Sequence, residues 1–194
     1  MCASRAPRPM TDGPGRIIFL TGASSSGKTS MARSIQEAMP TPFLHVASDH
    51  LAEMVPARRT DHGPFAWWTT VRPRFFDAFH RCLPAMTEAG NDLIVDHLIE
   101  FGFWRNQLRE LLTGLDVFLI GVHCDLDEID RRERERGDRM TGEGRGHIEI
   151  DRIHDLGPYD HEIDTTGRTP KDLATEVIDA WTHRTPSPSA LFAR

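Results

Sequence analysis

One octapeptide constrains the fold of this 194-residue chain more than any other feature: Gly22-Ala23-Ser24-Ser25-Ser26-Gly27-Lys28-Thr29. It has the Walker A spacing, in which four residues separate a glycine from a Gly-Lys-Thr triplet. An apolar run at residues 16–21 precedes it and predicts a strand, and a helical pattern follows it. The motif therefore predicts a nucleotide-binding α/β domain with a phosphate loop between the first strand and the first helix.

The fixed positions of this loop have chemical roles. We expect the two glycines to let the backbone turn back, so that its amides and the helix dipole face the phosphates. Lys28 is expected to neutralise the β and γ phosphates of ATP, and the Thr29 hydroxyl to ligate Mg²⁺. The chain has only one other lysine, Lys171, so a chance match is improbable. The predicted nucleotide contacts are Gly22, Ala23, Ser24, Ser25, Ser26, Gly27, Lys28, Thr29 and Ser30.

A second acidic motif narrows the class. Asp96 ends the apolar run at residues 92–96, where its carboxylate can hold magnesium directly or through water, or can simply cap the next turn. His97 follows it in place of the glutamate that motor-type ATPases use to polarise water, and no Asn-Lys-x-Asp or Thr-Lys-x-Asp segment for reading guanine occurs. These features favour phosphoryl transfer to an acceptor other than water.

The rest of the chain alternates apolar runs with helical patterns, which is typical of a mostly parallel sheet in a three-layer α/β domain. We predict one domain over residues 16–184, a disordered leader over 1–15 and a flexible tail over 185–194. Two helix starts have cap signals: Asp125 with Glu128 resembles a capping box, and Thr169 precedes a proline. The expected strands are 16–21, 43–48, 92–96, 117–124 and, more weakly, 162–164.

Composition excludes several function classes. The 23 basic and 29 acidic residues give a net charge of -6, which argues against an electrostatic nucleic-acid binder. No apolar run is long enough to span a bilayer, so no membrane partner is expected. The three cysteines have no CxxC spacing, which supports neither a disulfide framework nor zinc and favours the cytoplasm. A homo-oligomer is compatible with the sequence.

Candidate catalytic groups lie outside the loop. Asp49 ends the second predicted strand, where it can act as general base for an acceptor hydroxyl or cap the following helix, and the sequence leaves both readings open. Cations for the transferring group are expected in the arginine-rich run, from Arg132, Arg136 and Arg139, with a glycine-hinged lid over 137–147. The alternative is a solvated helix with the i to i+4 ion pairs Asp127–Arg131, Glu128–Arg132 and Asp130–Arg134, and we expect Arg131 and Arg134 to form such surface pairs.

Residues 57–80 are expected to shape the acceptor pocket. Trp67 and Trp68 are candidates for an apolar pocket, with core packing equally open, whereas Phe75 and Phe79 are expected in the core. Asp49 and Asp96 are expected to face the same pocket. A charged acceptor would call for the arginines of this region, which are Arg58, Arg59, Arg72 and Arg74.

The motifs together resemble the chloramphenicol phosphotransferase family of P-loop kinases. The resemblance implies an adenylate-kinase-like sheet of order 2-3-1-4-5 and ATP-dependent phosphorylation of a small molecule's hydroxyl, with an antibiotic such as chloramphenicol as one candidate acceptor. It also implies Asp49 as base, Arg136 with Arg132 or Arg139 as transition-state cations, and Arg168 near the adenine. The matching segments run from about residue 16 to 182 and are GASSSGKT, VASDHL, LIVDHL, IGVHCD, RERERGDR and YDHEIDTT.

Two departures keep other functions open. His97 stands where the family often has a second aspartate, and residues 57–80 do not match the family well. The alternatives are a kinase of a small metabolite, such as a nucleotide, sugar or shikimate-like acid, and a regulatory module that binds ATP without transfer.

Overall fold

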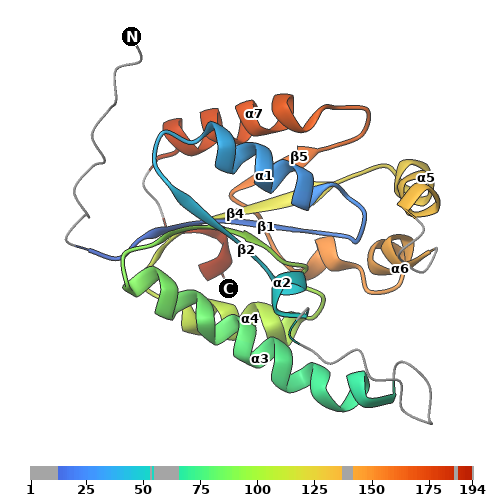
Figure 1. The fold of residues 1–194 in the computed structure, drawn as a ribbon, viewed down its shortest axis with the longest axis horizontal. Coiled ribbons are helices and arrows are strands. Elements are labelled where there is room, and N and C mark those ends of the chain that lie inside the picture. The colour runs from blue at the N-terminus through green and yellow to red at the C-terminus, as the bar shows by residue number, and fades with distance from the viewer. Residues whose placement is uncertain (1–12, 53, 55–65, 137–141, 186–187, 194) are drawn as a thin grey trace.

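A single parallel sheet organises the chain in the computed structural model, which describes residues 13–52, 54, 66–136, 142–185 and 188–193. Its strand order is β2-β3-β1-β4-β5, and every neighbouring pair is parallel (Figure 1). The predicted α/β class and the 2-3-1-4-5 order are confirmed. The strands are β1 (Arg16–Gly22), β2 (Phe43–Ala47), β3 (Asp92–Asp96), β4 (Asp116–His123) and β5 (His161–Asp164).

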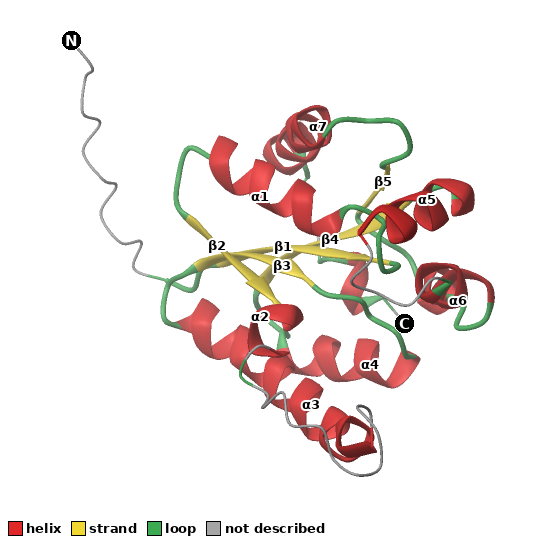
Figure 2. Cartoon of the chain, turned by 45° about the vertical axis from the view of Figure 1, so that its right-hand side comes forward, coloured by secondary structure: helices red, strands yellow, loops and turns green. Residues whose placement is uncertain are grey.

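Helices cover both faces of the sheet. Helices α1 (Lys28–Ala38) and α7 (Pro170–His183) pack on one face, and α3 (Ala66–Glu88) and α4 (Gly102–Leu111) on the other (Figure 2). In β1, Ile18 and Leu20 join the first core while Ile17 and Phe19 join the second, because successive strand residues point to opposite faces. A strand buried on both faces reads as a continuous apolar run, which is why the sequence shows it clearly.

Short elements complete the fold at the carboxyl ends of the strands and at the C-terminus. No helix among the described residues is long and apolar enough to cross a membrane. The second predicted strand is one residue too long, because Ser48 already begins a helix. The remaining elements are α2 (Ser48–Ala52), α5 (Leu126–Arg136), α6 (Glu143–Glu149) and the 3₁₀ turns η1 (Ile153–Leu156) and η2 (Ala190–Phe192).

Two predictions about the helix ends have different outcomes. The Thr169 hydroxyl accepts a hydrogen bond from the Asp172 amide at 3.2 Å, so the predicted cap of α7 is confirmed. Asp125 caps α5 through the Asp127 amide, but the capping box is wrong. Glu128 turns away to bind Arg131 and Arg132, while the Asp125 amide donates to the Thr166 hydroxyl.

The C-terminal segment differs from the flexible tail that its prolines suggest. Residues 188–193 pack against the sheet and α4, and Leu191 is fully buried in the second core. Asp160 accepts hydrogen bonds from the Ser189 hydroxyl and the Ala190 amide, which fixes the approach of the segment. For residues 188–193 the prediction is therefore wrong, because a leucine inserted into the core outweighs local composition.

Candidate active site

The phosphate loop joins β1 to α1 with a strained backbone. Gly27 has a left-handed φ of 95°, and Ser25 is one of the rare non-glycine residues with positive φ, at 59°. A β-carbon at Gly27 would also come within 3.1 Å of the Arg132 guanidinium. Gly22 serves a different purpose from the turn expected of it: a β-carbon there would lie 2.2 Å from the Val122 carbonyl of β4. Gly22 therefore lets β1 and β4 approach.

The loop presents polar groups that fit phosphate. The Lys28 ammonium donates to the carbonyls of Gly22 and Ala23, at 2.9 and 2.8 Å, and so lies across the loop. The Ser25 and Ser26 hydroxyl oxygens are buried and have no hydrogen-bond partner among the described residues. Buried polar atoms of this kind are normally satisfied, so a loop of donors around a lysine suits a bound anion.

Thr29 and Asp96 meet as the sequence predicts. The Thr29 hydroxyl donates to the Asp96 carboxylate at 2.6 Å, and the His45 imidazole approaches the same oxygen to 3.6 Å, a close contact that is too long for a hydrogen bond. Burial would raise the pKa of Asp96, but nearby His45, Lys28 and Thr29 hold it below its ordinary value. An ionised carboxylate beside a hydroxyl is a suitable oxygen donor set for Mg²⁺.

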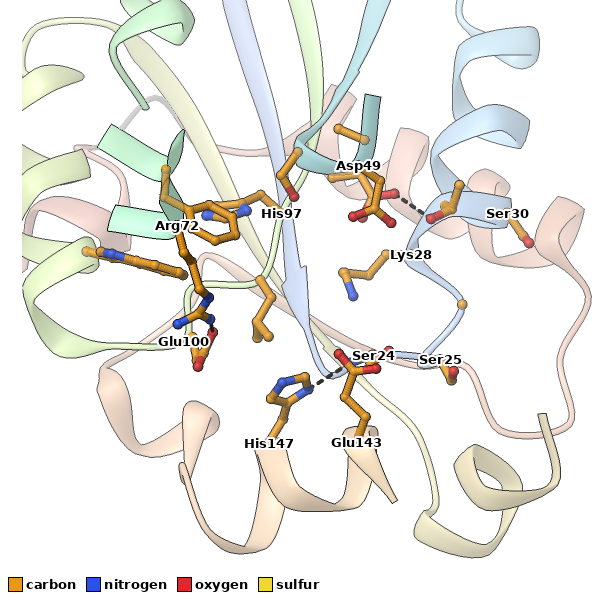
Figure 3. A pocket seen from close by; sticks show the side chains of 18 residues that line it. Ser24, Ser25, Lys28, Ser30, Asp49, Arg72, His97, Glu100, Glu143 and His147 are labelled. Carbon is orange, nitrogen blue, oxygen red and sulfur yellow. Dashed lines mark hydrogen bonds and ion pairs between the residues drawn. The ribbon is translucent and has the colours of Figure 1, made fainter. Parts of the chain in front are cut away.

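One cavity connects the loop with the ends of β2 and β3 (Figure 3). Asp49, in the first turn of α2, lines it together with Lys28, Thr29 and Asp96. The structure thus brings together the side chains predicted to act as base, phosphate-binding lysine and metal ligands, because the carboxyl ends of parallel strands share an edge. The remaining lining residues are Ser24, Ser25, Gly27, Ser30, Ala47, Ser48, Arg72, Phe76, His97, Leu98, Glu100, Trp104, Glu143 and His147.

Of the predicted cations, Arg132 contacts the phosphate loop. Its guanidinium donates to the Ser25 carbonyl at 3.4 Å and to the Thr165 carbonyl at 3.1 Å, and Glu128 binds its Nε at 2.8 Å. Arg136 ends α5, but its side chain and the whole of Arg139 lie outside the described residues, as does most of the predicted lid. The ion pair Glu128–Arg132, which the alternative reading of this run contains, is observed.

Two other predicted pairs are not those that form. Arg131 binds Glu128 and Glu135, while Asp127 and Asp130 contact Arg145 of α6. Acidic side chains of α5 thus hold α6 beside it, which a reading of α5 as an isolated solvated helix does not foresee. Arg168 binds Glu176 at 2.6 Å and does not line the cavity, so its contact with adenine stays a prediction.

Helix α6 lies on the phosphate loop and supplies two residues to the cavity that the sequence did not indicate. The His147 Nδ1 accepts a hydrogen bond from the Ser24 amide at 3.3 Å, and Glu143 lines the cavity beside it (Figure 3). A β-carbon at Gly144 would lie 2.5 Å from the Ser24 carbonyl, so the glycine permits this packing. Residues 142–147, predicted as part of a lid, thus begin a helix against the loop.

The far end of the cavity is aromatic and carries one ion pair. Arg72 of α3 binds Glu100 and lies over the rings of Phe76 and Trp104, 5.3 and 5.5 Å from their centroids. Phe79 is fully buried, as predicted, whereas Phe75 is only half-buried against Phe76. The side chains of Trp67 and Trp68 lie outside the described part of the structure, as do Arg58 and Arg59.

The fold and this site together define a P-loop kinase, an enzyme that uses ATP. A five-stranded parallel sheet of this order positions a Walker A loop against Thr29 and Asp96. A family model described as chloramphenicol phosphotransferase-like protein matches residues 15–182, and the chain belongs to that family. A protein of Mycobacterium tuberculosis, provisionally named an O-phosphotransferase, is 30% identical over 187 residues, covering 86% of this chain and 82% of the relative.

Solved structures share the fold at lower identity. The APS kinase of Mycobacterium tuberculosis, solved with AMPPNP and APS, has a TM-score of 0.63 at 19% identity, over 88% of this chain and 99% of its own. Shikimate kinase from Acinetobacter baumannii has a TM-score of 0.62 at 15% identity, over 89% of this chain and 96% of its own. The tunicamycin resistance protein of Deinococcus radiodurans has a TM-score of 0.61 at 23% identity, over 90% of this chain and 99% of its own. Identities this low support the fold alone.

Proposed function

We propose that this kinase transfers the γ-phosphate of ATP to a hydroxyl of an uncharged small molecule, with an antibiotic such as chloramphenicol as the first candidate. The observation that carries the proposal is the convergence of Asp49, Lys28 and the Thr29–Asp96 pair in one cavity. The cavity has room for an acceptor beside the phosphate loop, and its far end is aromatic. A pocket of apolar rings with a few polar groups is typical of small-molecule sites.

Asp49 is the proposed general base. It would accept the proton of the acceptor hydroxyl as the oxygen attacks phosphorus, and its place in the first turn of α2, just after β2, sets it across from Lys28 (Figure 3). Thr29 and Asp96 would hold the Mg²⁺, which neutralises phosphate charge when bound. Lys28 and the loop amides would bind the phosphates. Arg132, which Glu128 holds in place, would stabilise the loop conformation through its hydrogen bond to the Ser25 carbonyl.

The charges of the cavity favour an uncharged acceptor over an anionic one. Among the described residues, four carboxylates line it against two cationic side chains, Lys28 and Arg72. Arg72 is already paired with Glu100. The carboxylate of a shikimate-like acid would therefore meet Glu100 beside Arg72, and Arg72 would not be available to pair with it. Like charges repel strongly in a partly desolvated site. Arg74, which the sequence offered as a second cation, is exposed and does not line the cavity.

The test is a panel of hydroxyl compounds incubated with labelled ATP and Mg²⁺. The panel holds chloramphenicol, other neutral antibiotics, sugars, nucleosides and shikimate. We expect a phosphorylated neutral compound. Phosphorylation of shikimate alone would contradict the charge argument, and a wild-type chain that binds ATP but labels nothing would favour a regulatory module.

A matched pair of variants tests the base. Asp49→Asn keeps the size of the side chain but cannot accept the proton, so transfer should fall by about 100-fold or more while ATP binding remains. Asp179→Asn changes an exposed aspartate on α7 and should leave transfer unchanged. Full transfer activity in Asp49→Asn would show that another group acts as the base.

A further inference from the structure

A chain of hydrogen-bonded side chains runs from the surface to the acceptor end of the cavity. The Gln107 amide Nε2 donates to the Asp77 carboxylate at 2.5 Å, and Gln107 Oε1 contacts His80 Nδ1 at 2.8 Å. His80 Nε2 in turn contacts His97 Nε2 at 2.9 Å. Asp77 and His80 are on α3, Gln107 is on α4, and His97 follows β3 and lines the cavity.

The acidic end of the chain fixes the direction of every hydrogen bond. Arg81 binds Asp77 and lowers its pKa, so Asp77 is a carboxylate that can only accept. Gln107 must then donate to Asp77 with its nitrogen and accept from His80 with its oxygen. His80 Nδ1 therefore carries a proton, which leaves Nε2 of the neutral ring as an acceptor.

The same logic fixes the tautomer of His97. Its Nε2 must donate to His80, and its Nδ1 is then a bare lone pair. Both rings are buried among aromatic side chains, where a charged imidazole without an anionic partner is costly. The two imidazoles are thus neutral, as the tautomer assignment requires. A buried histidine with one nitrogen held by a neighbour is a rigid acceptor at the other.

The His97 Nδ1 is the one end of this chain without a partner. The atom is buried and has no hydrogen-bond partner among the described residues, although His97 lines the cavity at 2% exposure. Besides the His80 ring, His97 has the rings of Phe79, Phe76 and Trp104 around it, with centroids 4.8, 5.5 and 5.6 Å away. A buried acceptor among such rings is costly unless a ligand supplies a donor.

We propose that His97 is a specificity-determining residue whose Nδ1 accepts a hydrogen bond from the phosphate acceptor. The inference rests on the proposed function, since it assumes that the acceptor occupies this cavity. It defines the acceptor chemically as a molecule that carries a second donor, a hydroxyl or an amide N–H, besides the hydroxyl that is phosphorylated. Gln107 and His80 are positioning residues, because they act only by holding the His97 tautomer.

Two substitutions of His97 separate its nitrogens. Asparagine places an oxygen near the position of Nδ1, whereas glutamine places its amide near Nε2 and has no acceptor at the Nδ1 position. With the compound that the wild-type chain phosphorylates, we expect His97→Gln to raise the KM of the acceptor by about tenfold or more, with the KM of ATP unchanged. His97→Asn should stay within about threefold of wild type for both. Equal acceptor KM values in the two variants would overturn the inference.

The tautomer can be measured without any acceptor. Nitrogen-15 NMR of the full chain should show His97 protonated at Nε2 and His80 at Nδ1. Gln107→Leu should release both rings into mixed tautomers, while Asn106→Leu, an exposed change on the same helix, should not. A proton on Nδ1 of His97 in the wild-type chain would refute the inference, whatever the acceptor panel shows. A panel without product refutes the proposed function alone.

Discussion

Lys28 is a lysine in a chain whose positive charges are almost all arginines. Of the 23 basic residues, only Lys28 and Lys171 are lysines. The Lys28 ammonium lies 2.8 and 2.9 Å from the loop carbonyls, and in the proposed function it fits between these carbonyls and the phosphates of ATP. A guanidinium is larger and planar, so it suits the outside of the loop, where Arg132 lies.

Loss of this ammonium should disable the enzyme. We expect Lys28→Ala to lower kcat/KM for ATP by about 100-fold or more, because a charged donor to the transferring group is removed. Steady-state kinetics on the acceptor identified by the panel measure this. Lys171→Ala removes the other lysine, which is exposed in the first turn of α7, and should have no effect. Comparable kinetics in the two variants would refute the role of the phosphate loop.

Site residues that belong to a local sequence motif could be predicted, whereas those that tertiary packing brings to the site could not. Lys28, Thr29 and Asp96 could be predicted because each follows directly from a motif next to a strand. The sequence named Arg72 only as one of four arginines that a charged acceptor would need. His147 was not indicated, since it reaches the cavity from α6 through packing that no local pattern records. For His97 the sequence showed only that a family aspartate was replaced. Its hydrogen bond to His80, 17 residues away, becomes visible only in the fold.

At the scale of elements, α6 depends on a carboxylate from another helix. Glu133 of α5 is 1% exposed and accepts the amides of Gly142 and Gly144, at 2.7 and 2.8 Å, at the start of α6. Those amides have no partner inside their own helix. Helix α6 carries His147 and Glu143 at the cavity. By capping α6, the buried Glu133 therefore helps to position these two side chains.

Removing this cap should loosen α6 before it unfolds the domain. We expect Glu133→Ala to lower the free energy of unfolding by about 1–3 kcal/mol, because two buried amides lose their acceptor. Hydrogen exchange should become faster over residues 142–149 and remain slow in β1 and β4. Glu135→Ala, which removes an exposed ion pair with Arg131 on the same helix, is the control. Unchanged exchange over α6 in Glu133→Ala would show that other contacts hold the helix.

The sequence could not have identified α6 as a helix. Three of the residues from 142 to 146 are glycines, which disfavour helix, and the helix has only seven residues. Tertiary contacts supply what propensity lacks, namely the Glu133 cap, the packing of Gly144 on Ser24 and the bond from Ser24 to His147. The same glycines that suggest a mobile lid are those that permit close approach. Strands β1, β3 and β4 are the opposite case, because each contains a continuous apolar run in the sequence.

At the scale of the whole molecule, the C-terminus completes the second core. The sheet and its helices were predictable from alternating runs of apolar and helical pattern, but the last residues were not, because Leu191 and Phe192 are the only large apolar side chains in a polar, proline-containing segment. In the fold Leu191 packs with Phe19, Leu119 and Leu108 in the core beneath α4. The Arg105 guanidinium, 7% exposed, donates to the Ala190 carbonyl at 3.1 Å and holds the segment there.

The stability of the domain should therefore depend on this segment. Leu191→Ala creates a cavity at a fully buried position and should lower the free energy of unfolding by about 2–5 kcal/mol, measured by urea denaturation. Leu44→Ala, at a leucine that is 40% exposed on β2, should cost far less, because little buried surface is lost. Deletion of residues 188–194 should destabilise the domain at least as much as Leu191→Ala, since it also removes the bonds from Ser189 and Ala190 to Asp160. If the deletion left the urea midpoint unchanged, the segment would add nothing to the core, and the stability would come from the sheet and the helices that cover its two faces.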